Sequence, residues 1–111
     1  MERLLNAISA SIIDYQELPD KLTFDDAATL QGLMKNLSSN LFFLEKERDI
    51  EARAYYKTIH FLVKEGKSAT GSINEAKNQH PEKRYLDRII SAGYKTLDAM
   101  RSNQSFLKKE Q

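Results

Sequence analysis

Gly66, Lys67 and Ser68 come closest to a known chemical motif, the end of a phosphate-binding loop. That loop also requires a glycine five residues before the Gly-Lys pair, where this chain has Phe61. The loop normally follows a buried strand, whereas the residues before Gly66 have the apolar spacing of a helix. We therefore expect no nucleotide site here, and we expect Gly66 to end a helix in the left-handed conformation that glycine adopts easily.

A cluster of acidic residues is the next candidate, for binding a divalent cation: Glu45, Glu47, Asp49 and Glu51. Glu47 and Glu51 are one helical turn apart, a spacing that carboxylates in metal-binding helical bundles can use. Basic residues at positions 46, 48 and 53 alternate with these acids, three or four positions from a carboxylate. Ion pairs along one helix explain this pattern, so we expect no metal site.

The two histidines, His60 and His80, have no partner at the spacing of a metal site. The chain has no cysteine, which excludes disulfides, thiolate ligands and a cysteine nucleophile, and which is typical of a reducing compartment. The spacing of Ser, His and Asp indicates no catalytic triad. We therefore expect a protein that is not an enzyme, with no catalytic residue, metal ligand or cofactor.

Basic residues gather in the C-terminal half of the chain. Residues 1–55 contain 6 Lys and Arg against 10 Asp and Glu, and residues 56–111 contain 11 against 6. The net charges of −4 and +5 recover the total of +1. Tyrosines interleave with these basic residues, as in surfaces that bind a nucleic-acid strand, although a solvated helix face has the same composition. The residues of such a nucleic-acid face are Lys83, Arg84, Arg88, Lys95 and Arg101.

A helix-turn-helix would be a second way to place this region on DNA. Its helices would be residues 57–65, residues 68–78 and the start of the last helix, with Asn78–Pro81 as a turn of suitable length. The turn has no glycine, and the supposed recognition helix opens with Glu82 beside two basic residues. The motif is therefore only weakly indicated.

Four helices must position all of these residues. Apolar residues recur three and four positions apart over approximately residues 2–18, 24–65, 68–78 and 82–108, which predicts helices there. Prolines separate them at Pro19 and Pro81, and Thr23 is well placed to cap the second helix. The expected fold is all-α, a single domain over residues 1–111, built as an elongated antiparallel helical hairpin or bundle.

The second and fourth helices each carry an apolar seam with alternating steps of four and three residues, as in coiled coils. The two seams can pack together as an antiparallel pair, with the first helix covering part of the remaining apolar surface. A continuous second helix would be about 60 Å long, which exceeds the diameter of a compact domain of this size. We therefore expect an elongated molecule completed by a second copy, most simply as a dimer. The predicted packing and oligomer seam is Leu30, Met34, Leu37, Leu41, Leu44, Tyr55, Ile59, Leu62, Leu86, Ile90, Leu97 and Met100.

The N-terminal segment lacks the uninterrupted apolar region of a signal peptide and is predicted to be a helix. No stretch approaches 18 consecutive apolar residues. These patterns predict a cytoplasmic protein that has no contact with a membrane.

Four segments give the chain a resemblance to small helical proteins encoded by bacteriophages and prophages: residues 43–48 (FLEKER), 63–68 (VKEGKS), 99–102 (AMRS) and 106–110 (FLKKE). The resemblance covers about the C-terminal 60% of the chain. The genes of such proteins often lie near those for phage recombination and single-strand-binding proteins. The resemblance implies a phage or bacterial setting, favours a DNA-associated role, and supplies no site residues.

These observations lead to one expected function and one alternative. The expected function is that of a non-enzymatic helical interaction or scaffold module, which self-associates through the seams. The alternative is a nucleic-acid-binding accessory protein of phage DNA metabolism or regulation, which would use the basic face of the C-terminal helix.

Overall fold

The structure is a computed structural model that describes the backbone of residues 1–109 and the side chains of residues 1–107. It contains four α-helices: α1 (Glu2–Gln16), α2 (Ala27–Lys64), α3 (Ala69–Gln79) and α4 (Pro81–Lys109). A short 3-10 turn, η1 (Phe24–Asp26), precedes α2. No strand occurs among the described residues. The predicted all-α, elongated fold is confirmed, and the helices begin and end close to the predicted positions.

The start of α2 is set by Thr23 and Asp26. The Asp26 carboxylate accepts hydrogen bonds from the backbone N–H of Thr23 at 2.8 Å and from its hydroxyl at 3.2 Å. These bonds satisfy groups that a helix start leaves unpaired. Thr23 is the N-cap of η1, whereas the N-cap of α2 is Asp26, so the predicted cap lies one short turn before the α-helix.

The end of α2 is set by Gly66, which has a φ of +94°. The backbone N–H of Gly66 donates to the carbonyl of Val63 at 3.0 Å, and that of Lys67 donates to the carbonyl of Leu62 at 3.1 Å. This pair of bonds is the Schellman motif. The predicted role of Gly66 is confirmed. Between these ends α2 runs without interruption, as predicted.

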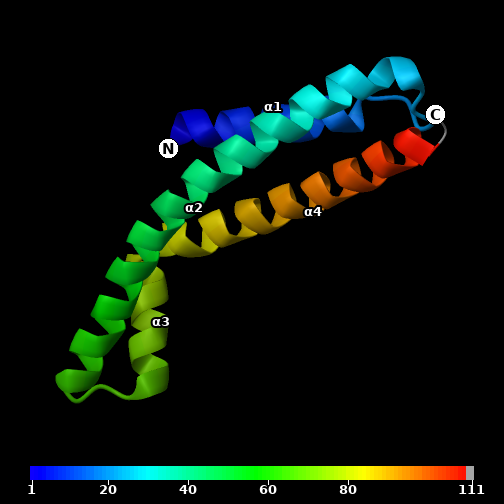
Figure 1. Ribbon diagram of the computed structural model, residues 1–111. Coiled ribbons are helices and arrows are strands. Elements are labelled where there is room, and N and C mark those ends of the chain that lie inside the picture. Colours follow the sequence, from blue (N-terminus) through cyan, green and yellow to red (C-terminus); the bar gives the residue numbers. More distant parts are fainter. Residues whose placement is uncertain (110–111) are drawn as a thin grey trace.

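The molecule measures 64 × 24 × 18 Å, and α2 runs along most of its length. In Figure 1, α1 and α4 lie along the N-terminal part of α2, whereas α3 lies along its C-terminal part. The chain therefore has a body (α1, α4 and the first part of α2) and an arm (residues 50–80), in which α3 doubles back on the end of α2. A groove lies where the two meet.

The hydrophobic core belongs to the body. Buried side chains from α1, α2 and α4 form one cluster there, which consists of Ile8, Leu30, Leu37, Leu41, Leu44, Leu86, Ile90, Leu97, Met100 and Leu107. A hydrogen bond from the Asn103 amide to the Tyr15 hydroxyl adds a polar link between α4 and α1. The apolar seams therefore meet inside one chain, with α1 covering the third side.

The contact between α2 and α4 depends on Gly93. A Cβ atom at this position would lie 2.4 Å from Cδ2 of Leu41, closer than real Cβ atoms approach other carbon atoms. Leu41 is fully buried and fills the space that a side chain at position 93 would need. Gly93 therefore allows the Leu41 side chain of α2 to pack directly against the backbone of α4.

The arm has far less buried apolar surface than the body. Its buried residues are Tyr55, Ser72 and Ala76, and none of them belongs to the main cluster. Ser68 caps α3 by accepting a hydrogen bond from the backbone N–H of Gly71 at 3.0 Å. Small side chains on α3 allow close packing against α2 but contribute little hydrophobic stabilisation.

None of the described helices is both long enough and apolar enough to cross a membrane.

Candidate functional site

The predicted seam residues lie between helices of the same chain. Of the twelve, Leu30, Leu37, Leu41, Leu44, Tyr55, Leu86, Ile90, Leu97 and Met100 are buried, and Met34, Ile59 and Leu62 are half-buried. This burial corrects one part of the expectation. Side chains that α1, α3 and α4 already cover cannot also form the contact to a second copy. Self-association stays a prediction, and it would have to use other residues.

A row of apolar side chains on α2 faces away from the core instead. Phe43, Ile50 and Phe61 are 49%, 57% and 60% exposed, and Ala54 lies between them and is half-buried. Their spacings of 7, 4 and 7 residues bring all four to one side of an α-helix. We call these four residues the outer row. From Phe43 to Phe61 it extends for about 27 Å.

The five basic residues predicted as a nucleic-acid face divide into two sets on α4. Lys83 and Arg101 lie beside the core face, and each forms an ion pair along the helix, with Asp87 at 3.1 Å and Asp98 at 3.4 Å. Arg84, Arg88 and Lys95 are exposed on the opposite side. No ion pair involves these three within the described side chains. They are the set that remains available to an anion.

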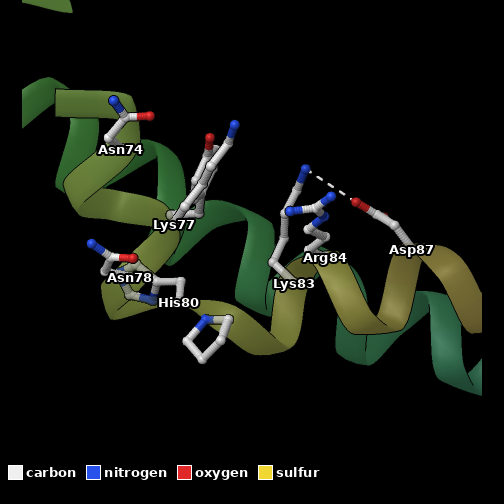
Figure 2. Close-up of a pocket in the computed structure, with 9 residues that line it drawn as sticks. Asn74, Lys77, Asn78, His80, Lys83, Arg84 and Asp87 are labelled. Carbon is white, nitrogen blue, oxygen red and sulfur yellow. Dashed lines mark ion pairs between the residues drawn. The ribbon is translucent and has the colours of Figure 1, made fainter. Parts of the chain in front are cut away.

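A groove of about 690 Å³ lies at the corner between α3 and α4. Tyr55 of α2 contributes to its wall, and Figure 2 shows most of the other residues that line it. The side chains of Lys77, Lys83 and Arg84 extend toward the same side of the corner in this view. The full lining is Tyr55, Asn74, Lys77, Asn78, His80, Pro81, Lys83, Arg84 and Asp87.

The charge in the groove is positive on balance. Three cationic side chains line it, and Asp87 is the one carboxylate among the lining residues. Asp87 is paired with Lys83 at 3.1 Å and with Arg48 of α2 at 3.3 Å. Its charge is therefore already compensated, whereas Lys77 and Arg84 have no ion pair among the described side chains.

Arg48 fixes the position of Asp87 from the opposite helix. Burial lowers the pKa of the Arg48 guanidinium, but hydrogen bonds and attraction to Asp49 and Asp87 outweigh burial, so its pKa lies above the ordinary value. The ion pair links α2 to α4 where the body meets the arm.

His80 is a structural residue of the same corner. Its Nε2 atom lies 2.8 Å from the hydroxyl oxygen of Thr58, and that hydroxyl lies 3.1 Å from the carbonyl oxygen of Ala54. If the single hydroxyl proton is donated to Ala54, Nε2 of His80 must donate to Thr58, which leaves Nδ1 as an acceptor in the neutral ring. The contact ties the α3–α4 junction to α2.

Tyr94, on another side of α4, has a raised pKa. Burial raises the pKa of the Tyr94 hydroxyl, and the carboxylate of Glu45 raises it further by accepting a hydrogen bond and by its negative charge. Arg101 and Arg48 act in the opposite direction without reversing the shift. Tyr94 is thus one of the tyrosines expected near basic residues, and it contacts an acid of the predicted acidic cluster.

The two incomplete motifs of the sequence have structural roles. Gly66 ends α2, Lys67 is paired with Glu75, and Ser68 caps α3. In the acidic cluster, Asp49 is the residue with an ion pair, to its neighbour Arg48 at 3.1 Å. Among the described residues, no group of three or more His, Asp or Glu side chains is placed to hold a metal ion.

The helix-turn-helix interpretation is wrong, because the turn between α3 and α4 is too short. Asn78 and Gln79 continue α3, and α4 begins at Pro81, so that only His80 separates the two helices. A helix-turn-helix requires a turn of about 3–4 residues to set its helices at the right angle. The basic residues at the start of α4 line a groove against α3 instead.

Sequence reasoning found some residues of these surfaces and missed others. It identified Lys83 and Arg84 but not Asn74, Lys77 and Asn78, because the groove is assembled from three helices. The outer row had a detectable pattern, since Phe43 and Ile50 are one heptad apart and Phe61 lies 18 residues, or five turns, from Phe43. The stronger leucine periodicity beside it obscured that pattern.

Comparison with known protein families, with curated proteins and with solved structures found no match to this chain. The function therefore has to be inferred from the geometry of the chain itself.

Proposed function

We propose that the protein is a non-enzymatic helical interaction module that forms a dimer through the outer row of α2. The observation that carries this proposal is the row itself: three large apolar side chains, each about half exposed, aligned on one exposed side of α2. Exposed apolar side chains that share one face of a helix can mark a site of protein association. The seam cannot serve this purpose, because it is covered within the chain.

The spacing of the row suits a second copy as the partner. If two α2 helices pack antiparallel about a twofold axis at the level of Ala52, Phe43 would lie opposite the partner's Phe61, and Ile50 opposite the partner's Ala54. The same surface can thus pair with itself, as a twofold interface requires.

The setting of this module follows from the sequence. The absence of cysteine supports a reducing cytoplasm, and the resemblance to phage-encoded helical proteins supports a phage or prophage origin. In that setting the protein would act as a scaffold or accessory factor.

Light scattering with size-exclusion chromatography tests the dimer, using Ile50→Asp to introduce a charge into the row. We expect a dimer for the unaltered protein and a monomer for this variant. Ile13→Asp is the matched control, because Ile13 is an exposed isoleucine on α1 outside the row, and it should remain dimeric. A monomer for the unaltered protein, or a dimer that persists in Ile50→Asp, would contradict the proposal.

A further inference from the structure

We infer that the groove between α3 and α4 binds the phosphate groups of a single-stranded nucleic acid. This activity is distinct from self-association, since no residue of the groove belongs to the outer row. The groove instead combines part of the predicted nucleic-acid face with residues of α3. Its recognition chemistry is the pairing of cationic and amide donors with phosphate oxygens.

The lining of the groove favours an anion. Lys77 and Arg84 approach from different helices, and neither forms an ion pair within the described side chains. Arg84 can offer two parallel N–H donors to one phosphate, a geometry that guanidinium groups provide. Asn74 and Asn78 add amide donors one turn apart on α3. The first turn of α4 also opens at this corner, and its dipole adds positive potential.

The surface beyond the groove favours a strand over a small phosphate compound. From Arg84, the exposed side of α4 continues with Arg88 and Lys95, which extends the line of cations for about 16 Å. A single phosphate group can contact only one end of this line. An extended polyanion can occupy the groove and follow the helix, which is how grooves for single strands are built.

The groove is less suited to duplex DNA. Proteins that insert a helix into the major groove need that helix to project from its neighbours. Here α3 packs against the C-terminal part of α2 and is joined to α4 through His80 alone, so the first turns of α4 form a wall of a recess. A preference for duplex DNA would therefore contradict this inference, although a basic surface without a groove could also produce it.

Fluorescence anisotropy with a labelled oligothymidylate tests the inference on the full chain. The groove variant is Lys77→Gln/Arg84→Gln, and the matched control is Lys21→Gln/Lys35→Gln. Lys21 and Lys35 are exposed, Lys21 in the loop before η1 and Lys35 in the first part of α2. In Figure 1 this part of α2 lies away from α3. Both variants remove two positive charges, so non-specific attraction changes equally.

We expect the groove variant to bind at least about tenfold more weakly and the control to change by less than about threefold. The slope of log affinity against log salt should become shallower by about 1.4 in the groove variant, because each contacted phosphate of a single strand contributes about 0.7. Circular dichroism should show equal helix content in both variants, since all four substituted side chains are exposed.

Three results would overturn the inference. The unaltered protein could fail to bind the oligonucleotide at low salt, or the two variants could lose affinity equally. Inorganic pyrophosphate could displace the oligonucleotide at the same phosphate concentration, which would identify a small phosphate ligand. A duplex of matched length could bind more tightly than the single strand, which would assign the basic surface to duplex DNA.

Discussion

Individual residues in this chain have roles that composition alone does not reveal, and its helical glycines are the clearest case. Gly32 in α2 has open space where a Cβ atom would lie, whereas a Cβ atom at Gly93 in α4 would overlap with Leu41. Glycine lowers helix stability by about 1 kcal/mol relative to alanine. At position 32 the glycine has no packing benefit that offsets this loss of stability. At position 93 the glycine allows the Leu41 side chain of α2 to pack against α4.

The same substitution should therefore have opposite effects at these two positions. Gly32→Ala should raise the free energy of unfolding by about 0.5–1 kcal/mol. Gly93→Ala should lower it by about 1 kcal/mol or more, because the cost of overpacking exceeds the gain in helix propensity. Urea unfolding of both variants checks this. A Gly93→Ala protein as stable as Gly32→Ala would show that Leu41 moves aside freely.

The raised pKa of Tyr94 predicts a dependence of stability on alkaline pH. Because folding raises this pKa, the folded state disfavours the tyrosinate form. The contribution of Tyr94 to stability is therefore fully present below its unfolded pKa of about 10 and is lost as the pH rises through the folded pKa. The variant Tyr94→Phe lacks this ionisation and should lose less stability than the unaltered protein above that pH.

Spectrophotometric titration of tyrosinate checks this directly. Tyr94→Phe should remove a component that titrates above the ordinary pH range of tyrosine. Tyr85→Phe is the control, because Tyr85 is exposed on the same helix. If removal of Tyr85 rather than Tyr94 abolished the high-pH component, the assignment would be wrong.

At the scale of the element, the arm is the part of the structure with the weakest packing. Ser72 lies at the centre of α3, fully buried, and its hydroxyl has no hydrogen-bond partner. An unpaired buried hydroxyl destabilises the folded state, and serine is also a weaker helix former than alanine. The arm thus contains a side chain that lowers its stability at the contact between α3 and α2.

We therefore predict that Ser72→Ala stabilises the protein by about 0.5–2 kcal/mol. Thermal unfolding followed by circular dichroism measures the change. Ser91→Ala is a suitable control, since Ser91 is exposed on α4 and its replacement changes helix propensity alone. A larger gain at position 91 than at position 72 would mean that the Ser72 hydroxyl is well satisfied.

At the scale of the whole molecule, stability depends on the contact between α2 and α4 in the body. Leu41 and Leu97 are almost completely buried in the core cluster. Replacing either by alanine should lower the free energy of unfolding by about 2–5 kcal/mol, because the loss of buried methyl groups leaves a cavity. Chemical denaturation checks this, with the exposed Ile13→Ala as control. Unchanged stability in both leucine variants would refute this core assignment.

Most of the helical architecture was predictable from the sequence because its causes are local. The ends of α2 depend on Thr23, Asp26 and Gly66, which act through hydrogen bonds and backbone angles within a few residues. The spacing of the leucines identified the sides of α2 and α4 that face the core. Such patterns follow from the geometry of a single helix, which is the same in any fold.

The sequence by itself thus determined four helices, their ends and their apolar faces, whereas the tertiary structure decided what covers those faces. A leucine seam can pair with another helix of its own chain or with a second copy, and its spacing is the same in both cases. Here α1 and α4 cover it, since helices joined by short turns are present at a high effective concentration. The groove and the outer row both follow from this packing of the helices within one chain. The first depends on how three helices meet, and the second is the face of α2 that this packing leaves uncovered.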